Sequence, residues 1–218
     1  MSLDSLRRRL VERLAPPASW RADAAPVRSD FDLNPDIAPD ATTLRPAAVL
    51  VAVMPRPEGA TVLLTRRADS LRSHTGQIAF PGGRLDQGET AVDAALREAW
   101  EEVALPPDSV EVLGLGDAYR TGTGFLVTPV VGWVTEPVAL TPAPDEVAEV
   151  FEVPWDFLMN PDNHRRDSYA LPEGQTRWFW AAPWGERYIW GVTAGVLRSL
   201  WSRLYEPGDE AAVAEDAA

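Results

Sequence analysis

The sequence of 218 residues predicts a mixed α/β fold. Apolar strand patterns stand before and after a central helical pattern at residues 90–103, and a second long helical pattern lies at residues 192–205. Apolar residues make up 45% of the chain, which is ordinary for a globular protein and sufficient for a core. The chain contains no internal repeat, so we expect one main domain with extensions at both ends.

The N-terminal part begins with an amphipathic pattern and continues as an irregular segment. "MSLDSLRRRLVERLA" places Leu3, Leu6, Leu10 and Leu14 on one stripe of a helix. Residues 15–46 are rich in proline, aspartate and alanine, which predicts an irregular lead-in along the surface. We therefore expect residues 1–44 to form a helix and a lead-in that pack on the main domain.

The main domain is expected at residues 45–205. "PAAVLVAVMP" (46–55) predicts a buried strand, and "ATVLLTRR" (60–67) predicts the second strand of a hairpin. Further strands are expected at 109–119 and 125–136, a strand running into a turn or short helix at 146–158, and an aromatic hairpin at 177–191. The acidic segment 206–218 predicts a disordered tail.

Composition limits the classes of function. The net charge is −13 and all 20 basic residues are arginine, which argues against a surface for duplex nucleic acid. No stretch approaches the roughly 20 apolar residues of a membrane span, and the N-terminus lacks the apolar run of a secretory signal. We expect a cytoplasmic protein without a nucleic-acid or membrane partner, and a homodimer is possible. The absence of cysteine excludes disulfides, thiol catalysis and cysteine-ligated zinc.

The central helix carries three carboxylates on one side. At 3.6 residues per turn, Glu98, Glu101 and Glu102 share one sector of the helix predicted at 90–103, where like charges repel. Upstream, "FPGGRLDQGE" supplies glycines that allow carbonyl groups to approach an ion closely. Hard oxygen ligands of this kind suit Mg²⁺ or Mn²⁺. Taken without further context, such glutamates are also compatible with solvated surface charge.

The spacing of these residues resembles the Nudix box. Gly83 is followed by five residues, Glu89, seven residues, and then "REAWEEVAL" (97–105). One position departs from the family pattern, because Ala104 stands where the family has the glycine that ends the helix. A left-handed alanine at this cap is expected to cost on the order of 1 kcal/mol.

The resemblance implies a Nudix hydrolase, which cleaves a nucleoside diphosphate linked to another group. It implies an α/β/α sandwich with a mixed central sheet, in which a loop–helix–loop holds divalent metal. The implied metal ligands are Glu98, Glu101, Glu102 and the carbonyl of Gly82. Two further roles are implied near them, with Arg97 orienting a glutamate and Glu89 supporting the loop or an outer metal. The catalytic base is expected within the box or on a later loop, at Glu149 first and at Glu146 as the reserve candidate.

Residues 63–83 indicate which substrate of this family the protein uses. "LLTRRADSLRSHTGQIAFPGG" resembles the signature of the coenzyme A pyrophosphatase branch of this family, and the full resemblance runs from about residue 45 to 204. Arginine binds phosphate bidentately, so the expected anion contacts are Arg67 and Arg72, with Arg66 and His74 as weaker candidates. Structural ion pairs for the arginines, and a loop hydrogen bond for His74, remain alternatives.

The implied reaction is metal-dependent hydrolysis of coenzyme A or its acyl derivatives to 3′,5′-ADP and (acyl-)4′-phosphopantetheine. Two alternatives stay open. One is hydrolysis of another nucleoside diphosphate compound, such as ADP-ribose or NADH, and the other is a Nudix module that binds a nucleotide without cleaving it.

Overall fold

The computed structural model describes residues 1–39, 43–68 and 76–206. The helices are α1 (Leu3–Arg13), α2 (Ala91–Val103), α3 (Trp155–Leu158) and α4 (Val192–Tyr205). The strands are β1 (Arg28–Ser29), β2 (Arg45–Arg56), β3 (Gly59–Arg67), β4 (Ile78–Ala79), β5 (Gly82–Arg84), β6 (Val110–Leu115), β7 (Tyr119–Arg120), β8 (Phe125–Val134), β9 (Val147–Pro154), β10 (Arg165–Ala170), β11 (Thr176–Trp184) and β12 (Arg187–Trp190). Among the described helices, none has the length and apolar character needed to cross a membrane.

A mixed sheet forms the centre of the molecule. Its strand order is β1-β7-β8-β2-β3-β4, with β5 also paired to β2, β6 to β8 and β9 to β3. Strand β2 runs parallel to β8 and antiparallel to β3, and Val53 lies opposite Val62 in the hairpin that the sequence predicts. The mixed α/β class is therefore confirmed.

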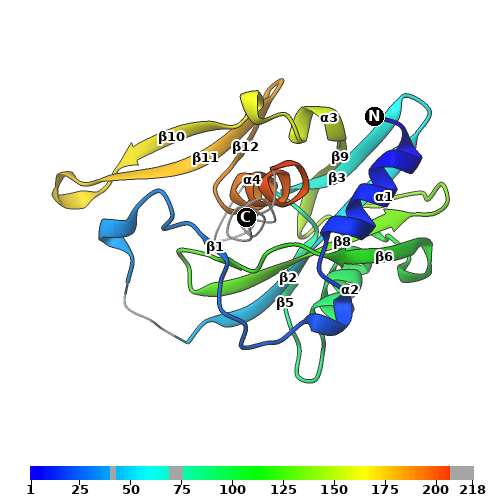
Figure 1. Ribbon diagram of the computed structural model, residues 1–218, viewed down its shortest axis with the longest axis horizontal. Helices are drawn as coiled ribbons and strands as arrows, with labels where there is room; N and C mark the ends of the chain where they lie inside the picture. The colour runs from blue at the N-terminus through cyan, green and yellow to red at the C-terminus, as the bar shows by residue number, and fades with distance from the viewer. Residues whose placement is uncertain (40–42, 69–75, 207–218) are drawn as a thin grey trace, which may run out of the picture.

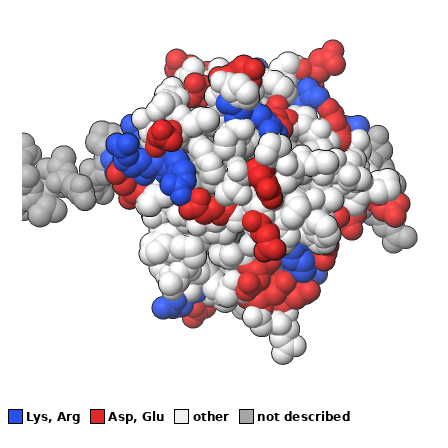
Figure 2. All heavy atoms as spheres, turned by 90° about the vertical axis from the view of Figure 1, so that its right-hand side faces the viewer, with Lys and Arg blue, Asp and Glu red and all other residues white. Residues whose placement is uncertain are grey.

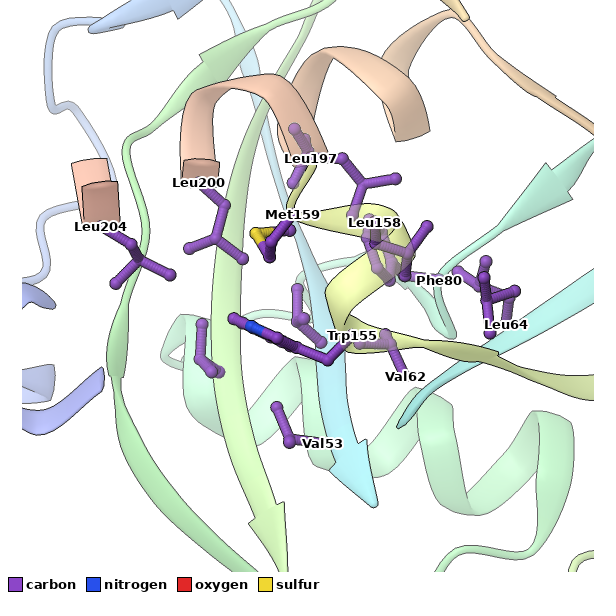
Figure 3. Close-up of a cluster of buried hydrophobic side chains, with 14 of the residues drawn as sticks. Val53, Val62, Leu64, Phe80, Trp155, Leu158, Met159, Leu197, Leu200 and Leu204 are labelled. Atoms are coloured by element: carbon purple, nitrogen blue, oxygen red, sulfur yellow. The ribbon is translucent and has the colours of Figure 1, made fainter. Parts of the chain in front are cut away.

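Helices cover both faces of this sheet (Figure 1). On one face, the small side chains of α2 let the helix lie close to β2 and β3, in a cluster that includes Ala95, Ala99 and Leu50. On the other face, α1, α3 and α4 pack on the same strands. In Figure 3, Trp155 lies between Val53 of the sheet and Leu200 of α4. The three layers are those of the expected α/β/α sandwich.

A separate three-stranded sheet is formed by β10, β11 and β12, and projects from the main body as an arm in Figure 1. The hairpin of β11 and β12 matches the aromatic pattern at 177–191. Strand β10 was not predicted, because "RRDSYA" is polar and exposed or half-exposed throughout, so no apolar alternation marks it.

Local signals at α2 are confirmed at both ends. The Thr90 side chain accepts from the Asp93 backbone, and the Asp93 side chain accepts from the Thr90 backbone, which forms a capping box of the kind that Thr at the first position and Asp three residues later favour. Ala104 ends the helix with φ 55° and ψ 34°, in the left-handed region. Upstream of the helix, residues 82–84 of the glycine-rich segment form strand β5, because their backbone pairs with β2.

Candidate active site

Helix α2 places its three glutamates in three different environments. Glu102 lies on the buried face and is 4% exposed, whereas the side chains of Glu98 and Glu101 are 16% and 55% exposed. The exposure of the three carboxylates therefore increases from Glu102, next to the sheet, through Glu98 to Glu101. Figure 2 shows one face of the molecule, on which acidic side chains gather in the lower part around a small basic group.

Arg97 connects these carboxylates to the preceding loop. Its Nε and Nη2 donate to the two carboxylate oxygens of Glu89 over 2.7 and 3.0 Å. Its Nη1 donates to Glu98 over 2.9 Å and to Glu101 over 3.2 Å. Glu89 in turn accepts from the backbone N–H of Asp86. Arg97 thus offsets part of the repulsion between the glutamates, and it orients two of them while Glu89 supports the loop.

Two glycines allow the strand β5 to approach the helix. A Cβ on Gly83 would lie 2.5 Å from Cδ of Glu98, so only glycine leaves room for that carboxyl group. Gly82 has φ 157°, and a Cβ there would lie 2.6 Å from Cα of Val49. The glycine pair is therefore a packing requirement of both the sheet and the carboxylate cluster.

Glu102 is a buried acid in a negative environment. Its pKa is raised to about 8, first by burial and then by the charges of Glu98 and Glu146, while Arg67 and a backbone hydrogen bond with Gly82 oppose the shift. Burial likewise raises the pKa of Glu98, against the stabilising contact with Arg97. Since a buried carboxylate is costly without a cation, this cluster favours a positive ligand.

The donor set fits a divalent metal. Arg97 engages one oxygen of Glu98 and one of Glu101, and each carboxylate has a second oxygen available as a ligand. In the side-chain positions of the described residues, no group of three acidic or histidine side chains already surrounds one point. Metal binding would therefore require Glu98 and Glu101 to turn from Arg97 towards Glu102. Carboxylate oxygens are the ligands that Mg²⁺ and Mn²⁺ prefer.

Neighbouring arginines of β3 point to different carboxylates. Arg67 is close enough to Glu102 to lower its pKa, and the Nε of Arg67 is buried without a hydrogen-bond partner among the described residues. Arg66 forms an ion pair with Glu149 over 3.6 Å. Of the four predicted substrate contacts, Arg67 therefore lies beside the glutamates of α2, whereas Arg66 is engaged elsewhere. Arg72 and His74 lie outside the described residues.

Glu149 and Glu146 differ in their relation to α2. Glu149 pairs with Arg66 and with Arg187 of β12. Its strand neighbour Val150 packs against the α2 cluster, so alternation directs Glu149 to the opposite face of the sheet. Glu146 precedes β9, and its charge raises the pKa values of Glu98 and Glu102.

The position of Glu146 follows from the loop that carries it. Ala143 donates its backbone N–H to the carbonyl of Glu102, and Glu146 donates its own to the carbonyl of Ala143. The reserve candidate thus lies in a loop that is hydrogen-bonded to α2 at Glu102. Sequence reasoning did not identify Arg187, whose only local signal is its place in the aromatic hairpin.

Comparisons with known proteins agree with this arrangement. The family model described as NUDIX domain matches residues 44–173. A protein of Cronobacter sakazakii described as an uncharacterized Nudix hydrolase, NudL, is 42% identical over 181 residues, covering 80% of this chain and 90% of its own length. The protein of the same description from Escherichia fergusonii is 43% identical over 171 residues, covering 77% and 87%.

Similarity to solved structures is weaker. A MutT/nudix family protein from Enterococcus faecalis has a TM-score of 0.46 and 17% identity, covering 91% of this chain and 73% of its own. At this TM-score the similarity does not bear on substrate or mechanism. The family match over more than half of the chain, together with the two relatives, is decisive: the chain belongs to the Nudix hydrolases, which act on phosphoanhydride bonds of nucleoside diphosphate derivatives.

Proposed function

We propose that the protein is a metal-dependent coenzyme A diphosphatase that yields 3′,5′-ADP and 4′-phosphopantetheine, or the acylated form of the latter. The observation that carries the proposal is the position of the two described parts of the segment 63–83. Strand β3 ends with Arg67 beside Glu102, and the strand β4, which pairs with β3, leads to Gly82 at the same carboxylate. Both described parts of the segment that resembles the coenzyme A signature therefore lie at the carboxylate site.

The residues that would hold Mg²⁺ or Mn²⁺ are Glu98, Glu101 and Glu102, with the carbonyl of Gly82 as a further ligand. When bound, the metal neutralises negative charge that develops on the phosphate oxygens and makes a bound water more acidic. Arg97 limits the orientations of Glu98 and Glu101, and its contact with Glu89 fixes it to the loop. These contacts offset part of the repulsion between the two carboxylates, and both side chains would turn from Arg97 towards Glu102 on metal binding.

A proton acceptor must take the proton of the attacking water. We assign this role to Glu146, which lies near Glu98 and Glu102, in preference to Glu149, which is paired with two arginines. An acceptor needs to reach the water bound at the carboxylates, directly or through one further water. The ion pairs of Glu149 hold it at the other face of the sheet.

Arg67 is the described residue best placed to bind a phosphate oxygen. Its buried Nε has no partner among the described residues, and a buried donor of this kind gains from an anionic acceptor. From the sequence alone, Arg72 is assigned to the 3′-phosphate that distinguishes coenzyme A from dephospho-coenzyme A.

The test is hydrolysis of a substrate panel with Mg²⁺ or Mn²⁺, with products identified by mass. Coenzyme A should give 3′,5′-ADP and 4′-phosphopantetheine, and Glu102→Gln should remove most of that activity while the protein stays folded. If ADP-ribose or NADH is cleaved faster than coenzyme A, the faster substrate takes the place of coenzyme A in the assignment. Binding of all these compounds without any product would instead indicate a non-catalytic nucleotide-binding module.

A second comparison tests the 3′-phosphate. Arg72→Ala should lower kcat/KM for coenzyme A roughly tenfold to a hundredfold, because a charge-assisted hydrogen bond contributes about 1.5–3 kcal/mol. The loss on dephospho-coenzyme A should be small, since that compound lacks the recognised group. Equal losses on both substrates would move the 3′-phosphate contact to Arg67 or another residue.

A further inference from the structure

A cavity of about 210 Å³ lies between the three-stranded arm and the main body. The N-terminal segment contributes Asp30 and Leu33, the strand β7 contributes Tyr119, and the arm contributes aromatic side chains of β10, β11 and β12. Much of this wall lies outside the residues that match the Nudix domain. The cavity is therefore built by the additions to that domain.

Aromatic rings form much of the wall. Tyr169 and Phe179 have ring centroids 5.8 Å apart, and Phe179 meets Trp190 edge-on at 5.2 Å. Tyr169 is 43% exposed although it borders the cavity, and it shares one face of the arm with Phe179. Among the described lining residues, aliphatic side chains come only from Leu33 and Val192. Ring faces open to solvent at a concave site are typical of ligand contact.

Hydrogen bonds hold the rim of the cavity in place. The Asn34 side chain donates to the carbonyl of Trp178 over 2.8 Å and accepts from its N–H over 2.7 Å, as a neighbouring strand would. Asp30 accepts from the hydroxyl of Tyr119 over 2.9 Å and from the N–H of Gly122 over 2.7 Å. The backbone of β11 is thus fixed at Trp178, which holds the neighbouring ring of Phe179 in place at the cavity.

The charges in the cavity argue against a phosphate as its occupant. Arg177 faces Asp30 over 3.5 Å, so the positive charge at the polar end is offset by a carboxylate. Since an anion would meet this carboxylate, a neutral group fits better. A neutral and flat group also matches ring faces better than an alkyl chain, which would suit aliphatic walls.

The cavity is connected to the carboxylate site by Gln77. This residue lines the cavity, and its carbonyl accepts from the backbone N–H of Arg67 over 3.0 Å. Arg67 is in turn close enough to Glu102 to lower its pKa. Thr193 at the start of α4 donates to the carbonyl of Ile78 over 2.9 Å, which fixes the helix that follows the arm to β4, the strand after Gln77.

We propose that this cavity binds the purine ring of the nucleotide half of the substrate, stacked against Tyr169 and Phe179, which lie on the same face of the arm. The inference rests on the proposed function, because it requires a substrate whose diphosphate reaches Glu102. Base stacking on aromatic side chains tolerates different bases, so the cavity supplies affinity for a nucleotide, while the group beyond the diphosphate is recognised elsewhere.

The experiment measures binding of adenosine 5′-monophosphate and of ribose 5-phosphate by calorimetry, on the full-length protein with Mg²⁺. Tyr169→Ala and Phe179→Ala should each raise the Kd of adenosine 5′-monophosphate about 5- to 150-fold. The Kd of ribose 5-phosphate should stay within about twofold, since this probe has no base to stack. Tyr169→Phe should retain much of the affinity, because phenylalanine also offers a ring face.

Tyr188→Ala is the matched control. Tyr188 belongs to the same arm and is 37% exposed, but it does not line the cavity. Its replacement should leave both Kd values unchanged. Unfolding temperatures of all variants show whether the arm remains folded.

The inference is overturned if the affinity for adenosine 5′-monophosphate is unchanged in both alanine variants, or if both probes lose affinity equally. These outcomes are separate from the substrate panel. If the wild type cleaves coenzyme A and Tyr169→Ala binds adenosine 5′-monophosphate as tightly as the wild type, the proposed function stands and the purine subsite is withdrawn. If the wild type cleaves only ADP-ribose and Tyr169→Ala binds adenosine 5′-monophosphate more weakly, the subsite stands and the coenzyme A assignment is withdrawn.

Discussion

Gly83 lies directly against the carboxyl group of Glu98: a Cβ at this glycine would be 2.5 Å from Cδ of the glutamate. Gly83→Ala should therefore displace the Glu98 carboxylate. Because that group ends a flexible side chain, the displacement should cost less than about 1 kcal/mol of unfolding free energy. A misplaced ligand should nevertheless lower kcat/KM roughly a hundredfold. The measurements are steady-state kinetics at saturating Mg²⁺ and chemical denaturation.

Gly82→Ala is the matched control, because the added Cβ there would meet backbone atoms of β2 at a φ of 157°. This change should destabilise the protein by about 1–3 kcal/mol or more. Activity that survives Gly83→Ala unaltered would show that Glu98 is not needed in its present position.

The two later glutamates should respond differently to neutralisation. Glu146→Gln should lower kcat by roughly 10²–10⁴-fold if its carboxylate accepts the proton of the attacking water. Glu149→Gln should have a smaller effect on kcat, since Glu149 is paired with Arg66 and Arg187. Rates measured against pH, together with unfolding temperatures, separate chemistry from stability. A larger loss in Glu149→Gln would return the role of base to Glu149.

The end of α2 carries a correctable strain. Ala104 has φ 55°, and among the described residues it is the only non-glycine residue with positive φ. Ala104→Gly should raise the free energy of unfolding by up to about 1 kcal/mol, because glycine adopts this conformation without the Cβ clash. Ala99→Gly, within the right-handed part of the helix, should instead lower it by roughly 0.5–1 kcal/mol or more. Denaturation by urea measures both, and a destabilised Ala104→Gly protein would contradict the cap assignment.

Buried His164 should make stability depend on pH. It is 8% exposed, its Nε2 lies 2.7 Å from the carbonyl oxygen of Leu158, and burial lowers its pKa below the ordinary value of 6.5. The folded state therefore binds the proton less readily than the unfolded state. The contribution of His164 to stability is complete above about pH 6.5 and is lost as the pH falls towards the lower, folded-state pKa.

Urea denaturation of the wild type and of His164→Gln between pH 5 and 8 checks this sign. The difference in unfolding free energy between the two proteins should shrink as the pH falls through this range. A difference that is constant with pH would mean that His164 titrates equally in both states.

Sequence patterns of short range determined much of this protein. The hairpin of β2 and β3, the capping box of Thr90 and Asp93, and the grouping of three glutamates all depend on residues close together in the chain. The left-handed Ala104 also followed from the position of this residue in the motif. These features could be predicted because the spacing of residues along the chain is enough to decide which side chains share one face of a helix or pair in a hairpin.

Only the tertiary structure decided which charges meet. The register of β3 and β9 shifts between Arg66 and Arg67, and one arginine pairs with Glu149 while the other lies near Glu102. The choice of Glu146 over Glu149 depends on the same sheet. Such contacts depend on strand order and register, because a shift of one residue reverses the face to which a side chain points.

In the aromatic cavity, too, the sequence predicts part of the structure and tertiary packing decides the rest. The sequence predicted the hairpin of β11 and β12, but the wall also needs Asp30 and Asn34, which lie more than 140 positions before Trp178. Nothing in their local sequence assigns them to that strand. The packing of the N-terminal segment on the arm brings them together, since the buried polar groups of both parts obtain hydrogen bonds only there.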